Sequence, residues 1–268
     1  MRGFRREKKL STWRRLALNA WGTPTDPKVY GTLEIDAAEA VTYVQSLRRE
    51  GGPRVTVTHL VGHAVALALR ERPDANAILR LGSLYRRETV DVYFQVAFEG
   101  GEDLNGHKVV SADQKDVLAI ARELEDGARA VRERRANAVK SAKSFGGLPP
   151  MLLGLAMKLG TFAHYDLGLD MTPLGVPWDG FGSVMVTNVG SFGLATGLAP
   201  LVPFSRCPIV LLIGEIHERP VVRDGAIVAR PILPIGVTFD HRIIDGYQAS
   251  KLARRFTQIL ENPGQTLG

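Results

Sequence analysis

A histidine, His241, stands where an apolar, strand-like run gives way to a charged turn in the stretch GVTFDHRIIDGYQASKLARRF. Asp245 and Gly246 follow it, and a helix-like segment begins directly after them. Imidazole has a pKa of about 6.5, so a well-placed histidine can take a proton from a substrate near neutral pH. A single histidine at the end of a strand more often has a structural role. The turn by itself leaves both interpretations open.

The remaining histidines offer weaker chemistry. His59 and His63, in HLVGH, are spaced so that both rings would share one face of a helix and could bind a metal. The stretch lacks the glutamate of a zinc hydrolase motif, and its other residues are apolar. We interpret both as packed or capping residues and expect no metal. His107, His164 and His217 have no constellation of chemical groups around them.

Two other features argue against familiar catalytic centres. Cys207 directly precedes the apolar run PIVLLIGEI, which is typical of a buried small side chain rather than a nucleophile. The glycine-rich stretch GSVMVTNVGSFG has no lysine of a phosphate-binding loop, so a mononucleotide loop is not expected. Within it, Asn188 and Gly190 are interpreted as turn formers.

Composition indicates a globular protein with one large domain or two small ones. The chain has 268 residues, of which 45% are hydrophobic and 23% charged. Its single cysteine excludes an internal disulfide and suits a reducing compartment. The basic N-terminus has no apolar stretch of a secretory signal, and no run approaches the roughly 18–20 apolar residues of a membrane span. We expect a cytoplasmic protein.

The net charge of +6 favours acidic partners, among them phosphorylated ligands, nucleic acid and anionic lipid. Charge alone does not separate these classes. The most basic stretch, residues 129–143, has no interleaved aromatic side chains for base stacking. We interpret it as a solvated helix face and expect no nucleic-acid partner.

Strand and helix patterns mix along the chain, without strict alternation. Apolar periodicity and turn residues predict a hairpin at Asp224-Gly225 and two strands joined by a charged turn within 82–101. Further strands are predicted at 28–36, 182–190, 208–216 and 230–240. Helices are predicted at 7–20, 37–52, 57–72, 115–144 and 247–263, and the third of these must end before Pro73. These elements predict a mixed α/β sandwich.

Residues 145–180 interrupt this order, since they are apolar, rich in glycine and proline, and carry few charges. We interpret them as a helical insertion packed on the core or on a neighbouring subunit. The alternative is a helix lying in a membrane interface, because the basic residues 129–143 just before it would favour an anionic surface.

The quoted turn carries a family resemblance. DHRIIDG resembles the His-x-x-x-Asp-Gly signature of the catalytic core of dihydrolipoamide acyltransferases, the acyltransferase component of 2-oxoacid dehydrogenase complexes. Chloramphenicol acetyltransferase is a relative of that family. Residues 182–193 are similar to the family's Gly-x-Phe-x-Ile-Ser/Thr-Asn-x-Gly segment, and residues 208–246 match in order and spacing. Weaker similarity in LSTWRRLALNAW, VYGTLEIDAAE and LVGHAVALALRERPDANA extends the resemblance over most of the chain.

The resemblance implies a chloramphenicol-acetyltransferase-like α/β sandwich in a single acyltransferase domain. It implies a homotrimer, with stacking of trimers into a cage left open, and an acyl group moving between coenzyme A and a thiol or similar acceptor. His241 would be the general base, and Thr187 of a neighbouring chain would supply the hydroxyl that holds the oxyanion. Asp245 would organise the turn, paired with Arg14 or Arg15, and Gly246 would let the chain turn tightly into the last helix.

Two departures from the family affect partners and acceptor. Family members carry lipoyl domains before the core, whereas this chain begins at the core, so we expect no covalent lipoyl group here and a separate lipoyl-carrying protein. Residues 99–116 replace a family strand that helps to shape the substrate channel, so the acceptor stays open. Two alternatives therefore remain: a non-catalytic trimeric or cage-forming scaffold that retains the fold, and a membrane-associated acyltransferase acting on a lipid-like acceptor.

Overall fold

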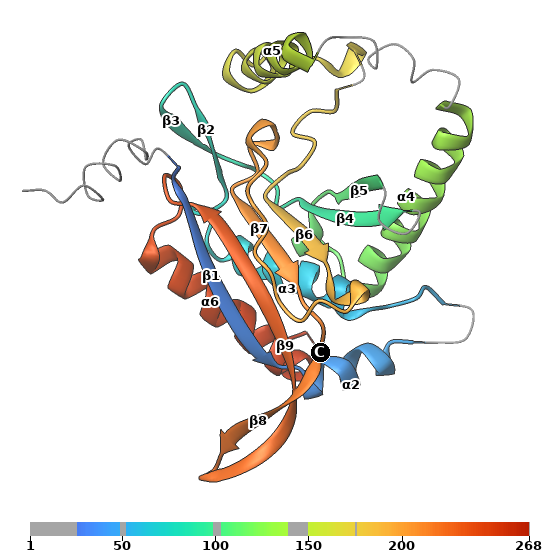
Figure 1. Cartoon of the computed structure of the whole chain (residues 1–268), viewed down its shortest axis with the longest axis vertical. Helices are drawn as coiled ribbons and strands as arrows, with labels where there is room; N and C mark the ends of the chain where they lie inside the picture. Colours follow the sequence, from blue (N-terminus) through green and yellow to red (C-terminus); the bar gives the residue numbers. More distant parts are fainter. Residues whose placement is uncertain (1–25, 49–51, 99–102, 139–149, 175, 268) are drawn as a thin grey trace, which may run out of the picture.

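The computed structural model describes residues 26–48, 52–98, 103–138, 150–174 and 176–267, and its centre is one mixed sheet (Figure 1). In spatial order its strands are β1 (Lys28–Asp36), β9 (Ala226–Asp240), β7 (Ile209–Ile213), β6 (Val184–Asn188), β4 (Val92–Phe98) and β5 (Asp103–Val109). Strand β6 runs parallel to β4 and β7, and the other pairs are antiparallel. Strand β8 (His217–Arg223) extends β9 as a long hairpin.

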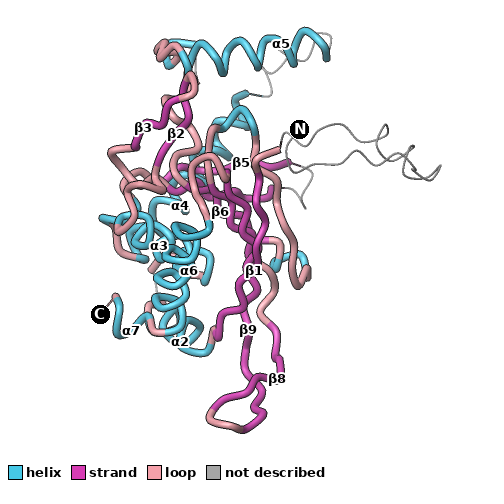
Figure 2. Tube along the Cα trace, turned by 90° about the vertical axis from the view of Figure 1, so that its left-hand side faces the viewer, coloured by secondary structure: helices cyan, strands magenta, loops and turns pink. Residues whose placement is uncertain are grey.

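Helices cover one face of the sheet (Figure 2). They are α2 (Ala38–Ser46), α3 (Val57–Arg70), α4 (Val117–Ala138), α6 (Gly246–Glu261) and α7 (Pro263–Thr266). Short helical turns are η2 (Ala112–Gln114), η4 (Thr172–Leu174), η5 (Gly190–Phe192) and η6 (Pro203–Ser205). The core lies between sheet and helices, where the inner side chains of the strands meet those of α3 and α6.

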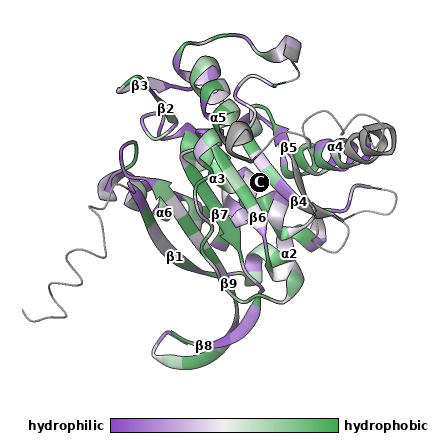
Figure 3. Ribbon diagram, turned by 45° about the horizontal axis from the view of Figure 1, so that its top comes forward, coloured by the Kyte–Doolittle hydropathy of each residue, from purple (hydrophilic) through white to green (hydrophobic). Residues whose placement is uncertain are grey.

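The sequence explains which elements are central. All five residues of β7, IVLLI, are buried, as expected for a strand covered on both faces. Figure 3 shows this strand in the green of hydrophobic residues. In α3 every residue from Leu60 to Leu69 is buried, because this helix packs against α2, α4, α6 and the sheet. The hairpin turn has positive φ at Asp224 (49°) and Gly225 (80°), which the tight hairpin predicted from Asp-Gly requires.

The predicted mixed α/β fold is confirmed, with three local differences. The two strands predicted within 82–101 do not pair, because β3 (Ser83–Arg86) pairs with β2 (Ala77–Arg80) while β4 joins the main sheet. Helix α2 ends at Ser46, earlier than predicted. Strand β5 forms within the segment that departs from the family sequence, since β4 supplies an antiparallel partner for its backbone. The helix predicted at 7–20 lies outside the described residues.

The segment 145–180 does contain a helix, α5 (Pro150–Thr161), followed by a single π-helical turn, η3 (Phe162–Asp166). Helix α5 lies away from the sheet and contacts mainly η3 and η6 (Figure 1). Its exposed apolar side chains include Leu155, Met157 and Leu159. Within the described ranges, none of the helices is long and apolar enough to cross a membrane. Contact of α5 with a membrane surface stays a prediction.

The first turn of helix α3 contains a histidine, His59, whose ring accepts a backbone hydrogen bond. The N–H of Thr56 donates to Nδ1 of His59 over 3.0 Å, and burial lowers the pKa of His59 to about 4. An unfolded histidine titrates near pH 6.5, so the unfolded chain binds the extra proton first as the pH falls. Stability that is present above pH 6.5 is therefore lost between about pH 6.5 and pH 4.

The change His59→Gln keeps an acceptor at this position and removes the titration. We expect acidification from pH 7 to pH 5 to destabilise the wild type by on the order of 1 kcal/mol more than the variant. Urea unfolding at both pH values measures the difference. Equal losses of stability in the two proteins would contradict the assignment to His59. They would indicate a group that both proteins contain, such as His63, whose pKa is also lowered.

Candidate active site

His241 is the first residue after β9, and its side chain is exposed while its backbone is fixed. Its N–H donates to the carbonyl of Pro27 over 2.9 Å, directly before β1. The preceding residue, Asp240, pairs in register with Lys28 of β1. Ile243 and Ile244 anchor the other side of the turn in the core. The imidazole is thus presented to solvent from a turn that is held at both ends.

The residues on either side of His241 form an ion pair that the sequence did not reveal. Nη2 of Arg242 lies 2.6 Å from Oδ2 of Asp240, and its Nε lies 2.9 Å from Oδ1. This bidentate contact raises the pKa of Arg242. Because Asp240 and Arg242 bind each other, neither side chain is free to cover the imidazole.

Asp245 caps α6 through reciprocal hydrogen bonds. Its Oδ1 accepts from the N–H of Gln248 over 2.9 Å, and its own N–H donates to Oε1 of Gln248 over 2.8 Å. Nε2 of Gln248 also donates to Asp74 over 2.8 Å, and the neighbouring Arg72 holds the pKa of Asp74 far below its usual value. Asp245 thereby fixes the turn that carries His241. Its expected partners, Arg14 and Arg15, lie outside the described residues.

The role expected for Gly246 is wrong. Its φ is not positive, and an added Cβ would meet no atom within 4 Å. Gly246 is the first residue of α6, a position that any side chain tolerates here. The tight entry into the helix comes from the extended backbone of Asp245, whose φ is −92° and ψ 179°, rather than from glycine.

Thr187 lies in β6, half-buried, on the sheet face opposite the helices. The next residue, Asn188, points to the helical face and donates from Nδ2 to Oγ1 of Thr58 in α3 over 2.8 Å. Because side chains alternate along a strand, Thr187 shares its face with Met185, which packs in a small apolar cluster with Val210. Asn188 also accepts from the N–H of Ser191 over 3.2 Å, as expected for a turn former.

One chain does not bring Thr187 and His241 together. Thr187 pairs in register with Leu212 of β7, which pairs with Gly236 of β9. Gly236 precedes Asp240, the residue next to His241, by four positions, a distance of about 14 Å along a strand. Two further strand spacings of roughly 4.8 Å separate the residues across the sheet. A reaction that uses both side chains therefore needs two copies of the chain.

An open groove of about 720 Å³ lies beside His241. Asp240 and Arg242 line it, as does Pro27, whose carbonyl accepts the hydrogen bond from His241. Its other walls come from α5 and from the loop at 201–207. The groove therefore borders the turn that carries His241, whose neighbours on both sides line it.

The other sequence candidates have structural roles. Cys207 is 4% exposed, and burial raises the pKa of its thiol to about 12, so the prediction of a buried small side chain is confirmed. His63 is buried in α3 and His59 accepts at the helix start, as predicted for packed and capping residues. In the parts of the chain that the structure describes, no three His, Cys, Asp or Glu side chains gather as metal ligands would.

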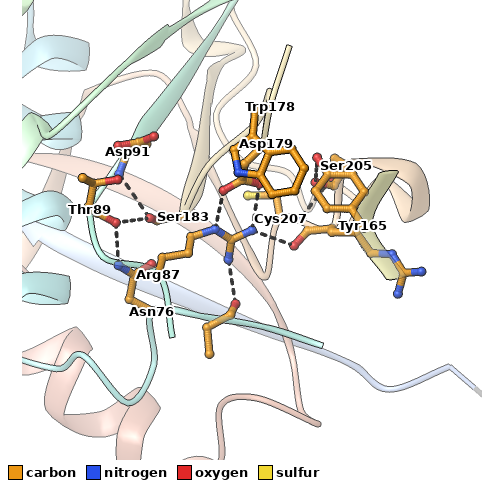
Figure 4. A network of polar contacts seen from close by, with 12 residues as sticks. Asn76, Arg87, Thr89, Asp91, Tyr165, Trp178, Asp179, Ser183, Ser205 and Cys207 are labelled. Carbon is orange, nitrogen blue, oxygen red and sulfur yellow. Dashed lines mark hydrogen bonds and ion pairs between the residues drawn. The ribbon is translucent and has the colours of Figure 1, made fainter. Parts of the chain in front are cut away.

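A buried polar network ties the end of the insertion to the core (Figure 4). Nε and Nη2 of Arg87 donate to the two carboxylate oxygens of Asp179 over 2.7 and 3.1 Å, and Nη1 donates to the carbonyl of Ala77 over 2.7 Å. Nearby, Nη2 of Arg206 lies 2.5 Å from Oδ2 of Asp166 in η3. These pairs could not be predicted from the sequence, since their members lie far apart in the chain.

A family model described as the catalytic domain of 2-oxoacid dehydrogenases acyltransferase matches residues 9–144 and 179–268. The lipoamide acyltransferase component of the branched-chain alpha-keto acid dehydrogenase complex of Bacillus subtilis (strain 168) is 25% identical over 241 residues, covering 88% of this chain and 47% of the relative. A dihydrolipoyllysine-residue acetyltransferase component of the pyruvate dehydrogenase complex of Rickettsia felis is 23% identical, covering 83% and 44%. The chain thus spans about half the length of these curated relatives.

Solved structures share the fold. The cubic core of a pyruvate dehydrogenase multienzyme complex aligns with a TM-score of 0.67 at 22% identity, covering 95% of this chain and 87% of that one. A probable dihydrolipoamide acetyltransferase from Listeria monocytogenes aligns at 0.66 and 21%, covering 96% and 95%. The expected acyltransferase-core fold is therefore confirmed. With most of its length matched by the family model, the chain belongs to the 2-oxoacid dehydrogenase acyltransferase catalytic-domain family.

Proposed function

We propose that this protein moves an acyl group between coenzyme A and a thiol acceptor at a site shared by two copies of the chain. His241 of one copy is the general base, and Thr187 of its neighbour is the oxyanion donor. The observation that carries this proposal is the position of His241, which is exposed on a turn fixed by the Asp245 cap, between two residues that line a groove. The separation of Thr187 from His241 within one chain supports a site at a subunit boundary.

The chemistry fits these two side chains. A ring nitrogen of His241 takes the proton of the acceptor S–H as the sulfur attacks the thioester carbonyl. The carbonyl π electrons move to oxygen, and the hydroxyl of Thr187 donates a hydrogen bond to the resulting oxyanion. Collapse of the tetrahedral intermediate reforms the carbonyl and breaks the bond to the coenzyme A sulfur. That thiolate takes the proton from the imidazolium, which leaves a new thioester and free coenzyme A.

A solved relative supports the choice of residues. Crystallographic and enzymatic work on the dihydrolipoamide acetyltransferase of Azotobacter vinelandii addresses a serine, a histidine and an asparagine in its catalytic mechanism. The asparagine follows the histidine by four positions there, the spacing of Asp245 from His241 here. Thr187, like that serine, carries a hydroxyl group that can donate a hydrogen bond.

We also infer a homotrimer. In a closed cyclic trimer each chain meets one neighbour through the surface that carries His241 and the other neighbour through the surface that carries Thr187, which gives three identical sites. Relatives named as components of 2-oxoacid dehydrogenase complexes suggest a separate lipoyl-carrying protein as partner. Light scattering tests the assembly directly, since a trimer has three times the mass of the chain. A monomer at assay concentration would contradict the shared site.

The activity itself is tested by incubation of the protein with acetyl-coenzyme A and dihydrolipoamide. We expect free coenzyme A and S-acetyl-dihydrolipoamide in equal amounts, measured by mass spectrometry, at a rate proportional to protein concentration. A panel of other acyl-coenzyme A donors and of amine acceptors runs in parallel, because the family match does not fix the acceptor. No acyl transfer with any pair would overturn the proposal.

A cage-forming scaffold is the second candidate, because a structural neighbour forms the cubic core of a multienzyme complex. A scaffold would assemble into cage-sized particles in light scattering without binding coenzyme A in calorimetry. An enzyme would bind coenzyme A whatever its assembly state. Calorimetry and light scattering on one preparation therefore separate the two candidates.

A further inference from the structure

The groove beside His241 has a wall that the family match does not include. Met157, Lys158 and Thr161 of α5 line it, whereas the family model stops at residue 144 and resumes at 179. The opposite wall comes from matched parts of the chain, among them Pro27 and Arg242. The groove therefore combines the shared catalytic turn with a helix from an additional segment. Helix α5 can therefore contact a part of the substrate that the residues matched by the family model do not contact.

Most of the groove surface is apolar, and part of it is exposed to water. The apolar side chains that line it include Leu79, Met157, Leu201, Val202, Phe204 and Ile243. Met157 is 43% exposed and Phe204 41%, so both would lose water contact when a ligand binds. A volume of about 720 Å³ lies in the range of small-molecule sites. This surface suits an extended hydrocarbon chain.

Among the residues that the structure describes, the charges in the groove leave one cation, Lys158, free for a ligand. Lys28 lies 3.0 Å from Asp26, Arg242 lies 2.6 Å from Asp240, and Arg206 is paired with Asp166. Lys158 also lines the groove and is exposed, and its ammonium group forms no hydrogen bond or ion pair with any residue that the structure describes. An anionic group on a bound chain would meet this ammonium at the α5 wall, away from the turn that carries the imidazole.

We propose that the groove binds the acyl group of the substrate, and that this acyl group is an apolar chain ending in a carboxylate. The inference rests on the proposed acyl transfer, since it places the thioester carbonyl at His241. The methylene chain then lies along Phe204 and Met157, and the terminal carboxylate pairs with Lys158. The α5 helix is a specificity element that selects dicarboxylic acyl groups over monocarboxylic ones of the same length.

The test compares adipyl-coenzyme A with hexanoyl-coenzyme A, which have equal chain length and differ in the terminal carboxylate. Binding is measured by calorimetry without acceptor, so that it does not depend on turnover. We expect the wild type to bind the adipyl compound about tenfold more tightly. Lys158→Gln should abolish this preference. Lys251→Gln, a change of an exposed lysine on α6 that does not line this groove, should keep it.

Two results would overturn the proposal. One is equal affinity of the wild type for the two compounds. The other is an equal loss of affinity for adipyl-, hexanoyl- and acetyl-coenzyme A in Lys158→Gln, because Lys158 would then contact the coenzyme A moiety. If the wild type turns over acetyl-coenzyme A but binds adipyl- and hexanoyl-coenzyme A equally, the groove assignment is wrong and the proposed acyl transfer stands. If the wild type binds adipyl-coenzyme A more tightly but turns over no acyl-coenzyme A donor, the proposed acyl transfer is wrong and the binding site stands.

Discussion

Replacement of His241 by alanine should lower kcat for acyl transfer by about 10³-fold, since a positioned general base contributes roughly 10²–10⁴. Without the imidazole, the acceptor thiol, whose pKa is about 8.5, has no group at the turn to take its proton. The fold should be unaffected, because the side chain is exposed and its backbone N–H still donates to Pro27. Steady-state kinetics and urea unfolding of the same preparation measure both effects.

His217→Ala is the matched control, because His217 lies on the β8 hairpin and the one hydrogen bond of its side chain among the described residues is to the carbonyl of Glu215. It should keep wild-type kcat. A His241→Ala protein with wild-type turnover, folded as judged by unfolding, would remove the catalytic assignment.

Complementation between two inactive variants tests whether the site is shared. Thr187→Val keeps the shape of the side chain and removes the hydroxyl, which should lower kcat by roughly 10²–10³-fold. In trimers assembled from equal amounts of His241→Ala and Thr187→Val chains, one boundary in four joins an intact His241 to an intact Thr187. Refolding the two together should restore about a quarter of wild-type activity. Activity no higher than the average of the separate variants would contradict the shared site.

Much of the fold could be predicted because its signals are local. The continuous apolar run of β7 indicates a buried central strand, and Asp224-Gly225 supplies the two residues that a tight hairpin turn prefers. The pairing of β3 with β2 could not be predicted in this way. Its strands are only four residues long, and the choice of partner depends on the side chains that pack around them.

The candidate site likewise has a part with a local sequence signal and a part that depends on contacts between distant segments. His241 and Asp245 lie within one short turn whose residue types and spacing resemble a known signature, so both could be identified from sequence. The groove could not, because it forms only where the start of β1, the loop at 201–207 and α5 meet in space. Nor could the pair Arg87–Asp179, since a single charge carries no information about a partner 92 positions away.

That ion pair supports the second large prediction: Arg87→Met should destabilise the protein by about 3–5 kcal/mol. The side chain of Arg87 is 7% exposed and that of Asp179 is 18% exposed. Removal of the guanidinium leaves the carboxylate of Asp179 in a poorly hydrated site without its bidentate partner, and it also frees the carbonyl of Ala77. Thermal unfolding should show a fall in Tm of about 10 °C for a domain of this size.

The double variant Arg87→Met/Asp179→Asn separates the buried charge from simple loss of packing. Asp179 has a φ of 42°, a conformation that asparagine tolerates better than most residues, so the second change adds little backbone strain. Because the double variant buries no unpaired charge, it should recover more than half of the stability lost in Arg87→Met. If the double variant is as unstable as the single one, the cost comes from packing around Arg87, and the ion pair is not what fastens the end of the insertion to the core.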